Sequence, residues 1–172
     1  YPSITKVYAA LSARLKSQRY QIQQGLDIAS VGGRPVDFRA LVQKGKTEEW
    51  EITSIVGRIA GANHFVSNLA KGGSISPMKE AIVRSNIPAG RRKTAIQELK
   101  RAALSVAKGI DESIPAHFGE LGVDLAVDRS GRVWLLEVNS KPSKNDNTQL
   151  TEGKIRPSVK KLIQYARYIA NG

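Results

Sequence analysis

A strand–turn–strand pattern late in the chain limits the possible folds more than any other part of the sequence. Two short, largely apolar runs, at 119–127 and 132–139, flank the turn Asp128-Arg129-Ser130-Gly131 and predict a β-hairpin. Two more strands are expected at 36–44 and 49–60, separated by the turn Gly45-Lys46-Thr47, and residues 20–28 read as a further strand. The sheet is therefore expected to be built largely from neighbouring antiparallel strands.

Three helices are predicted around these strands, because apolar residues recur at helical spacing. They cover residues 3–19, with Ser3 as N-cap, residues 91–109, and a last helix that opens at Pro157. The inward faces are expected at Ile4, Val7, Tyr8, Leu11 and Leu15 in the first, Ile96, Leu99, Ala103, Val106 and Ile110 in the second, and Val159, Leu162, Ile163, Ala166 and Ile169 in the third. Residues 61–90 and 140–156 read as long polar loops. The fold class is α+β, in one domain without repeats.

Composition limits the function classes. The 172 residues carry 27 Lys and Arg against 15 Asp and Glu, a net charge of +12. Such a balance calls for an anionic partner, either nucleotide phosphates or nucleic acid, or for an acidic counterpart on another segment. The absence of cysteine excludes disulfides and thiolate chemistry and fits a cytoplasmic location. No run of residues is long and apolar enough to span a membrane.

The predicted hairpin carries the strongest chemical signal. Glu137 and Asn139 are two residues apart on one strand, so their side chains share a face, and Asp124 on the other strand can lie across from them. Two carboxylates and an amide oxygen suit magnesium, or manganese in its place, together with substrate phosphates. Paired acids on a solvent-facing strand are the alternative interpretation. The apolar residues before Glu137 favour a partly buried carboxylate that needs a cation.

Two arginines on the earlier strands form a second signal. Arg39 shares a strand face with Asp37, with which it can pair, and Arg58 interrupts an apolar strand. Guanidinium groups bind phosphate oxygens in a bidentate manner, although for either arginine taken alone a structural ion pair is the favoured interpretation. We predict that both arginines project into one concave surface with the hairpin acids. The loop Lys71-Gly72-Gly73-Ser74 could bring backbone amides to an anion.

Five segments, in order, resemble ATP-grasp ligases of the ribosomal-protein glutamate ligase and glutathione synthetase kind, and most closely the spore-coat-associated YheC/YheD-type members. They are Ile22-Gln23-Gln24-Gly25-Leu26, Asp37-Phe38-Arg39, Arg58, Ser67-Asn68-Leu69-Ala70-Lys71-Gly72-Gly73, and the pair Gly122-Val123-Asp124 with Glu137-Val138-Asn139-Ser140-Lys141-Pro142. The resemblance covers about residues 20–170. It implies the C-terminal subdomain of an ATP-grasp fold over residues 1–172, with most of the phosphate-clamping subdomain either lying before residue 1 or missing.

The resemblance also implies roles for individual residues. Asp124, Glu137 and Asn139 match magnesium ligands, and Arg39, Arg58 and Asn68 match residues that reach the phosphates and the acceptor. The adenine hinge matches Gln24, Gly25 and Leu26, with Asp27 as a ribose contact and Lys71 on the phosphate side. The implied reaction phosphorylates a carboxylate with ATP, and an amine then attacks the acyl phosphate. The acceptor and the amine donor are not implied; spore-coat proteins are implied as partners and spore association as a location.

Two other function classes remain open on the sequence. A catalytically degenerate ATP-grasp domain could serve a structural or nucleotide-sensing role. A nucleic-acid binder is suggested by the net charge and by the cationic runs Arg91-Arg92-Lys93 and Lys100-Arg101, but aromatic residues make up only 6% of the chain and no nucleic-acid motif occurs. The isolated chain is expected to show no ligase turnover.

Overall fold

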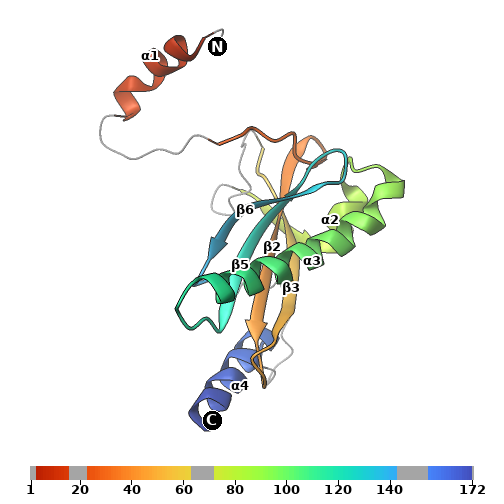
Figure 1. Ribbon diagram of the computed structural model, residues 1–172. Coiled ribbons are helices and arrows are strands. Elements are labelled where there is room, and N and C mark those ends of the chain that lie inside the picture. Colours follow the sequence, from red (N-terminus) through yellow and green to blue (C-terminus); the bar gives the residue numbers. More distant parts are fainter. Residues whose placement is uncertain (1–2, 16–22, 63–71, 143–154, 172) are drawn as a thin grey trace.

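The computed structural model describes residues 3–15, 23–62, 72–142 and 155–171 (Figure 1). The helices and strands follow one another as α1 (Ile4–Leu15), β1 (Ser30–Val31), β2 (Arg34–Lys44), β3 (Trp50–Ile59), β4 (Ser74–Pro77), α2 (Met78–Arg84), α3 (Ala89–Ser113), β5 (Glu120–Val127), β6 (Val133–Asn139) and α4 (Pro157–Asn171). The α+β class predicted from the sequence is confirmed, and so are the two hairpins and the helix that opens at Pro157.

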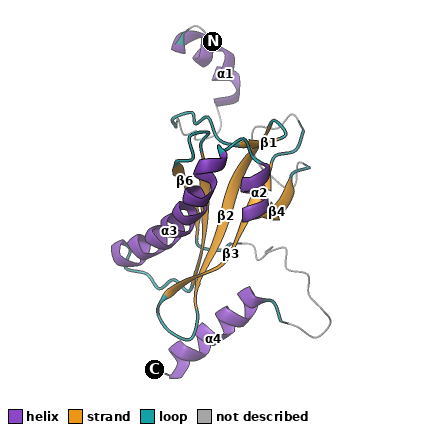
Figure 2. Cartoon of the chain, turned by 90° about the vertical axis from the view of Figure 1, so that its right-hand side faces the viewer, coloured by secondary structure: helices purple, strands orange, loops and turns teal. Residues whose placement is uncertain are grey.

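The strands form an antiparallel sheet in the order β4-β3-β2-β5-β6, and the short β1 pairs with the start of β2. Helices α2 and α3 pack on one face of this sheet, and α4 packs near the end of β2 (Figures 1 and 2). None of the helices in the described part of the chain is long and apolar enough to cross a membrane.

The core lies between the sheet and α3. Val36, Phe38 and Ala40 alternate along β2 toward the helices and are fully buried, as are Leu99 and Ala103 of α3. The intervening positions of β2 point to the other face of the sheet because successive strand side chains alternate. The second face is therefore free of the helical core and carries polar side chains.

Two expectations about irregular segments are wrong. Residues 61–90 are not one long loop, because 74–84 form β4 and α2. Gly57 explains why these elements pack there: a Cβ at that position would lie 2.5 Å from the Cβ of Ala81 in α2, so only glycine allows the contact. In the described part of 20–28 no strand forms beyond a single bridge between Ile28 and Asp128.

The outer helices also differ from the predicted burial pattern. Ser3 does cap α1, since its Oγ accepts a hydrogen bond from the backbone N–H of Lys6 at 3.3 Å, but Ile4 and Tyr8 of the apolar stripe are exposed. In α4 the buried residues are Ser158 and Tyr165, whereas Ile163 and Ile169 of the predicted inward face are exposed. Polar and aromatic contacts decide the orientation of α4.

These contacts come from β2 and from the segment between α3 and β5. Gln43 Nε2 donates a hydrogen bond to the carbonyl oxygen of Ser158 at 3.0 Å, and Tyr165 Oη lies 2.8 Å from His117 Nε2. The Tyr165 ring lies against Gly119, where a Cβ would come within 2.7 Å of it. Helix α4 is thus fixed on the same face of the sheet as the side chain of Gln43, with no need of its full apolar stripe.

Candidate functional site

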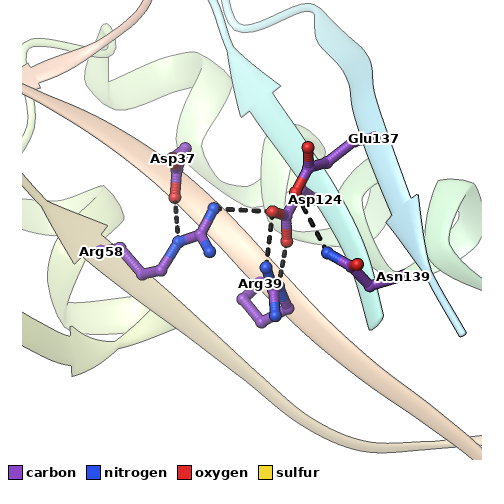
Figure 3. A network of polar contacts seen from close by, with 6 residues as sticks. All are labelled: Asp37, Arg39, Arg58, Asp124, Glu137 and Asn139. Carbon is purple, nitrogen blue, oxygen red and sulfur yellow. Dashed lines mark hydrogen bonds and ion pairs between the residues drawn. The ribbon is translucent and has the colours of Figure 1, made fainter. Parts of the chain in front are cut away.

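Two arginines and two aspartates form a polar cluster on the sheet face opposite α3 (Figure 3). Arg39 holds the Asp124 carboxylate through both Nε and Nη2, with Nη2 2.7 Å from Oδ2. Arg58 donates from Nε to Asp37 at 2.6 Å and from Nη2 to Asp124 at 2.9 Å. We call Asp37, Arg39, Arg58 and Asp124 the arginine–aspartate network.

Strand register creates this network. Arg39 of β2 lies directly opposite Asp124 of β5, and Asp37 of β2 lies directly opposite Arg58 of β3. Directly paired residues in antiparallel strands project to the same face and lie within side-chain reach. The sequence suggested Asp37 as the partner of Arg39; in the structure Arg39 binds Asp124, and Asp37 accepts a hydrogen bond from Arg58. The shared face predicted for the arginines and Asp124 is confirmed, while its concavity stays a prediction.

Burial makes these charges depend on each other. The Asp124 side chain is 3% exposed, and each arginine side chain is 18% exposed. Burial by itself lowers the pKa of Arg58, but the hydrogen bond and charge of Asp37, followed by those of Asp124, raise it above its ordinary value. The Arg58 guanidinium therefore carries a positive charge at any physiological pH.

Gly122 makes room for the network. It lies two residues before Asp124 on the same face of β5, and a Cβ there would come within 2.8 Å of Pro142 Cβ and 3.5 Å of Arg39 Cδ. The missing side chain lets Arg39 lie flat across β5 and lets buried Pro142 close over it. The Gly-Val-Asp string thus has a packing reason in this structure: glycine gives space and aspartate receives the arginine.

Glu137 and Asn139 lie beside Asp124 on β6. Glu137 is paired directly with Asp124, and Asn139 Nδ2 donates to Glu137 Oε1 at 3.1 Å, so the three predicted oxygen donors share one face (Figure 3). A bulge after Asp124 shifts the register of β6, so that Leu135 pairs with Leu125 on the other face. The expectation that Glu137 is partly buried is wrong, because β6 is the edge strand and Leu135, Leu136 and Glu137 are all exposed.

The three oxygen donors by themselves supply only part of the ligands that Mg²⁺ requires. Within the described residues, no three or more His, Cys, Asp or Glu side chains are grouped so that they alone could hold a metal ion. Asp124, Glu137 and the amide oxygen of Asn139 are hard donors of the kind that Mg²⁺ takes alongside water and substrate phosphates. Two guanidinium groups already occupy the Asp124 carboxylate, which shows that this position accepts cationic partners. The role of the three residues as metal ligands remains a prediction.

The predicted adenine hinge lies at the hairpin-turn end of the sheet. Asp27 pairs with Arg129 at 3.1 Å across an exposed surface, and Ala29 N donates to Val127 O at 2.7 Å. Gln24 and Gly25 are exposed and Leu26 is half-buried. Asp128, which bridges to Ile28, is four residues from Asp124, so the segment ends roughly 13 Å along the strand from the network. An extended nucleotide could cover that distance, but adenine and ribose contacts remain predictions.

Two predicted residues, Asn68 and Lys71, lie outside the described residues, so their roles also remain predictions. Sequence reasoning missed two members of the site. Asp37 was considered only as a neighbour of Arg39, and Gly122 only as part of a motif. The Asp-x-Arg spacing was the available signal for Asp37, but its partner on β3 depends on register, which the sequence does not specify.

The sequence is similar to a known protein family and to two curated relatives. A family model described as YheC/D-like ATP-grasp matches residues 1–169. This chain belongs to the YheC/D-like ATP-grasp family. It is 33% identical over 126 residues to the endospore coat-associated protein YheD of Bacillus subtilis (strain 168), covering 73% of this chain and 27% of YheD. It is 25% identical over 131 residues to YheC of the same organism, covering 76% of this chain and 35% of YheC.

The fold has a counterpart among solved structures. The C-terminal domain of K. lactis Pby1, described as an ATP-grasp enzyme that interacts with the mRNA decapping enzyme Dcp2, superposes with a TM-score of 0.54 at 18% identity. The match covers 96% of this chain and 50% of that one, and at this identity it supports the fold alone. The chain spans about a quarter to a third of the length of the curated relatives that it matches.

Proposed function

We propose that this chain supplies the magnesium- and phosphate-binding part of an ATP-dependent carboxylate–amine ligase that works through an acyl phosphate. The observation that carries the proposal is the convergence of Arg39 and Arg58 on Asp124, beside Glu137 and Asn139, on the sheet face left free by α3. Membership of the ATP-grasp family supports it. The remainder of the clamp would come from the rest of the protein, since the relatives are much longer than this chain.

In this proposal the acidic and amide side chains bind the cation, and the arginines bind the phosphates. Bound Mg²⁺, or Mn²⁺, would neutralise the ATP phosphates and withdraw charge from the phosphoryl group that is transferred. Asp124, Glu137 and Asn139 would hold the ion, and Arg39 and Arg58 would bind phosphate oxygens in the forked geometry that guanidinium allows. The protein therefore positions an acceptor carboxylate and ATP for transfer, after which the amine donor displaces phosphate.

The proposal includes partners beyond ATP. The acceptor carries a carboxylate and the donor an amine. Because the relatives YheD and YheC are endospore coat-associated proteins, we extend spore-coat association, with spore-coat proteins as partners, to this chain as part of the proposal. A catalytically degenerate, nucleotide-sensing domain would use the same residues without turnover.

The test measures nucleotide affinity of the full-length protein by calorimetry, with Mg²⁺ and with EDTA, for Glu137→Ala. Glu137 is exposed on the edge strand, so the change should leave the fold intact while it removes the magnesium dependence of binding. Glu80→Ala, an exposed carboxylate of α2, is the matched control. If Glu137→Ala keeps the full magnesium dependence, the metal assignment is refuted. Binding without acyl-phosphate formation would support the degenerate alternative, and a salt-dependent DNA shift would support a nucleic-acid binder.

A further inference from the structure

We propose that Asp37 is a positioning residue that makes cation binding and phosphate binding at the arginine–aspartate network depend on each other. The inference rests on the proposed function, because it assumes that a divalent cation and a phosphate group meet at Asp124. It adds a role for Asp37, which would touch neither ligand and would act through Arg58.

The argument begins with the charges of the network. Two guanidinium groups face two carboxylates, so the four side chains carry no net charge among themselves. Asp124 is almost fully buried, and both of its oxygens accept hydrogen bonds from arginine. Neither arginine can turn to an incoming anion without giving up an interaction with Asp124, unless a replacement partner for the carboxylate is present.

Either ligand alone is therefore penalised. A cation that binds Asp124 by itself displaces Arg39 and the Nη2 group of Arg58, and these donors then lack their acceptor in a site where each arginine side chain is only 18% exposed. An anion that takes the guanidinium groups by itself leaves a buried carboxylate without a cation, which is costly. When both ligands arrive, the partners are exchanged: the cation takes Asp124 and the anion takes the arginines. Each ligand then removes the penalty of the other, which is positive coupling.

Asp37 is the residue that enforces this exchange. It accepts from Arg58 Nε at 2.6 Å, whereas Nη2 of the same guanidinium reaches Asp124 at 2.9 Å. Arg58 can thus change the partner of Nη2 while Nε stays on Asp37. Without the Asp37 charge, two arginines would face one carboxylate, and Arg58 could bind an anion while Arg39 alone keeps Asp124 neutralised. Cation and anion would then bind nearly independently.

The experiment uses Asp37→Asn in the full-length protein, because asparagine keeps an oxygen acceptor for Arg58 and removes only the charge. The probe is the non-hydrolysable ATP analogue AMP-PNP, titrated by calorimetry with saturating Mg²⁺ and with EDTA. We expect the unaltered protein to bind ~10- to 100-fold more tightly with Mg²⁺, within the usual range of coupling between sites. In Asp37→Asn this ratio should fall to about fivefold or less, mainly through tighter binding in EDTA.

The matched control is Glu80→Gln, which also removes one negative charge from an arginine pair, here the exposed Glu80–Arg84 pair at 2.9 Å. It should leave the ratio unchanged, so that a general effect of net charge is excluded. A purely structural role of Asp37 would lower the melting temperature without changing the ratio. If Asp37→Asn keeps the ratio of the unaltered protein within twofold, the inference is refuted although the proposed function stands.

A second measurement needs no variant, in case Asp37→Asn folds poorly. The melting temperature of the unaltered protein is recorded with MgCl₂, with Na₂SO₄ and with both, at constant ionic strength. We expect the joint shift to exceed the sum of the separate shifts, because each ion supplies the partner that the other displaces. Purely additive shifts would refute the coupling. Failure of AMP-PNP to bind under any condition would instead refute the proposed function.

Discussion

Gly122→Ala tests whether the network is packed as closely as its geometry indicates. The new Cβ would lie 2.8 Å from Pro142 Cβ, about 0.7 Å inside the shortest comfortable carbon–carbon contact. The neighbour is the rigid ring of a buried proline, so it cannot rotate away, and the strand or the residues after it must move. Arg39 Cδ, at 3.5 Å from the new atom, is also in contact with it.

The expected cost follows from two opposing terms. Overpacking of this kind costs roughly 1–3 kcal/mol, while replacing glycine by alanine in a strand recovers roughly 0.5–1 kcal/mol of conformational entropy. The difference between the two terms is roughly 0–2.5 kcal/mol. Because the 2.8 Å overlap is with a rigid ring, we expect the upper part of this range. The free energy of unfolding should therefore fall by about 1–2.5 kcal/mol, which for a chain of this size lowers the melting temperature by roughly 2–10 °C. Arg39 should also be displaced, so AMP-PNP should bind more weakly.

The assay is urea denaturation followed by fluorescence, with Gly109→Ala of α3 as the control. A Cβ at Gly109 meets nothing within 4 Å, so this change should stabilise the helix by roughly 0.5–1 kcal/mol. The two glycine-to-alanine changes are thus expected to have opposite signs. A Gly122→Ala protein that is as stable as the unaltered one would show that Pro142 does not close over β5 as described.

Three further predictions concern stability. Gly57→Ala should destabilise by about 2–3 kcal/mol in urea denaturation, because its Cβ would overlap that of Ala81; an unchanged midpoint would contradict the α2 packing. Burial raises the pKa of Asp128, but hydrogen bonds from Ser130, Trp134 and Arg132 outweigh it and lower this pKa to about 2. The ionised carboxylate therefore stabilises the folded protein above about pH 4, and this contribution is lost as the pH falls through 2. Asp128→Asn should therefore cost ~1–2 kcal/mol at pH 7 and little at pH 2; equal costs at both pH values would refute this. Lys44→Met should lower the free energy of unfolding by about 1–3 kcal/mol, because Asp111 loses its 2.8 Å ion-pair partner. The double variant Lys44→Met/Asp111→Asn should be less destabilised. An equal or larger loss in the double variant would show that the broken ion pair does not cause the destabilisation.

Local pattern alone predicted the elements that later carry the site. Two short apolar runs around a turn predicted the hairpin. The spacing of two residues put Glu137 and Asn139 on one face, because a strand's side chains repeat every second residue. The Asp-x-Arg spacing likewise put Asp37 and Arg39 on one face of β2. These conclusions needed no information about distant residues.

Which charged groups meet depends on the register of distant strands, which the local pattern does not contain. Arg39 pairs with Asp124 and Arg58 with Asp37 because β2 lies between β3 and β5 in one particular register, and a shift of one residue would send every side chain to the opposite face. The same holds for exposure: Glu137 follows an apolar run, yet it is exposed because β6 is the edge strand. Sequence periodicity determines the face on which a side chain lies, whereas strand order and register determine what lies opposite it and whether anything covers it.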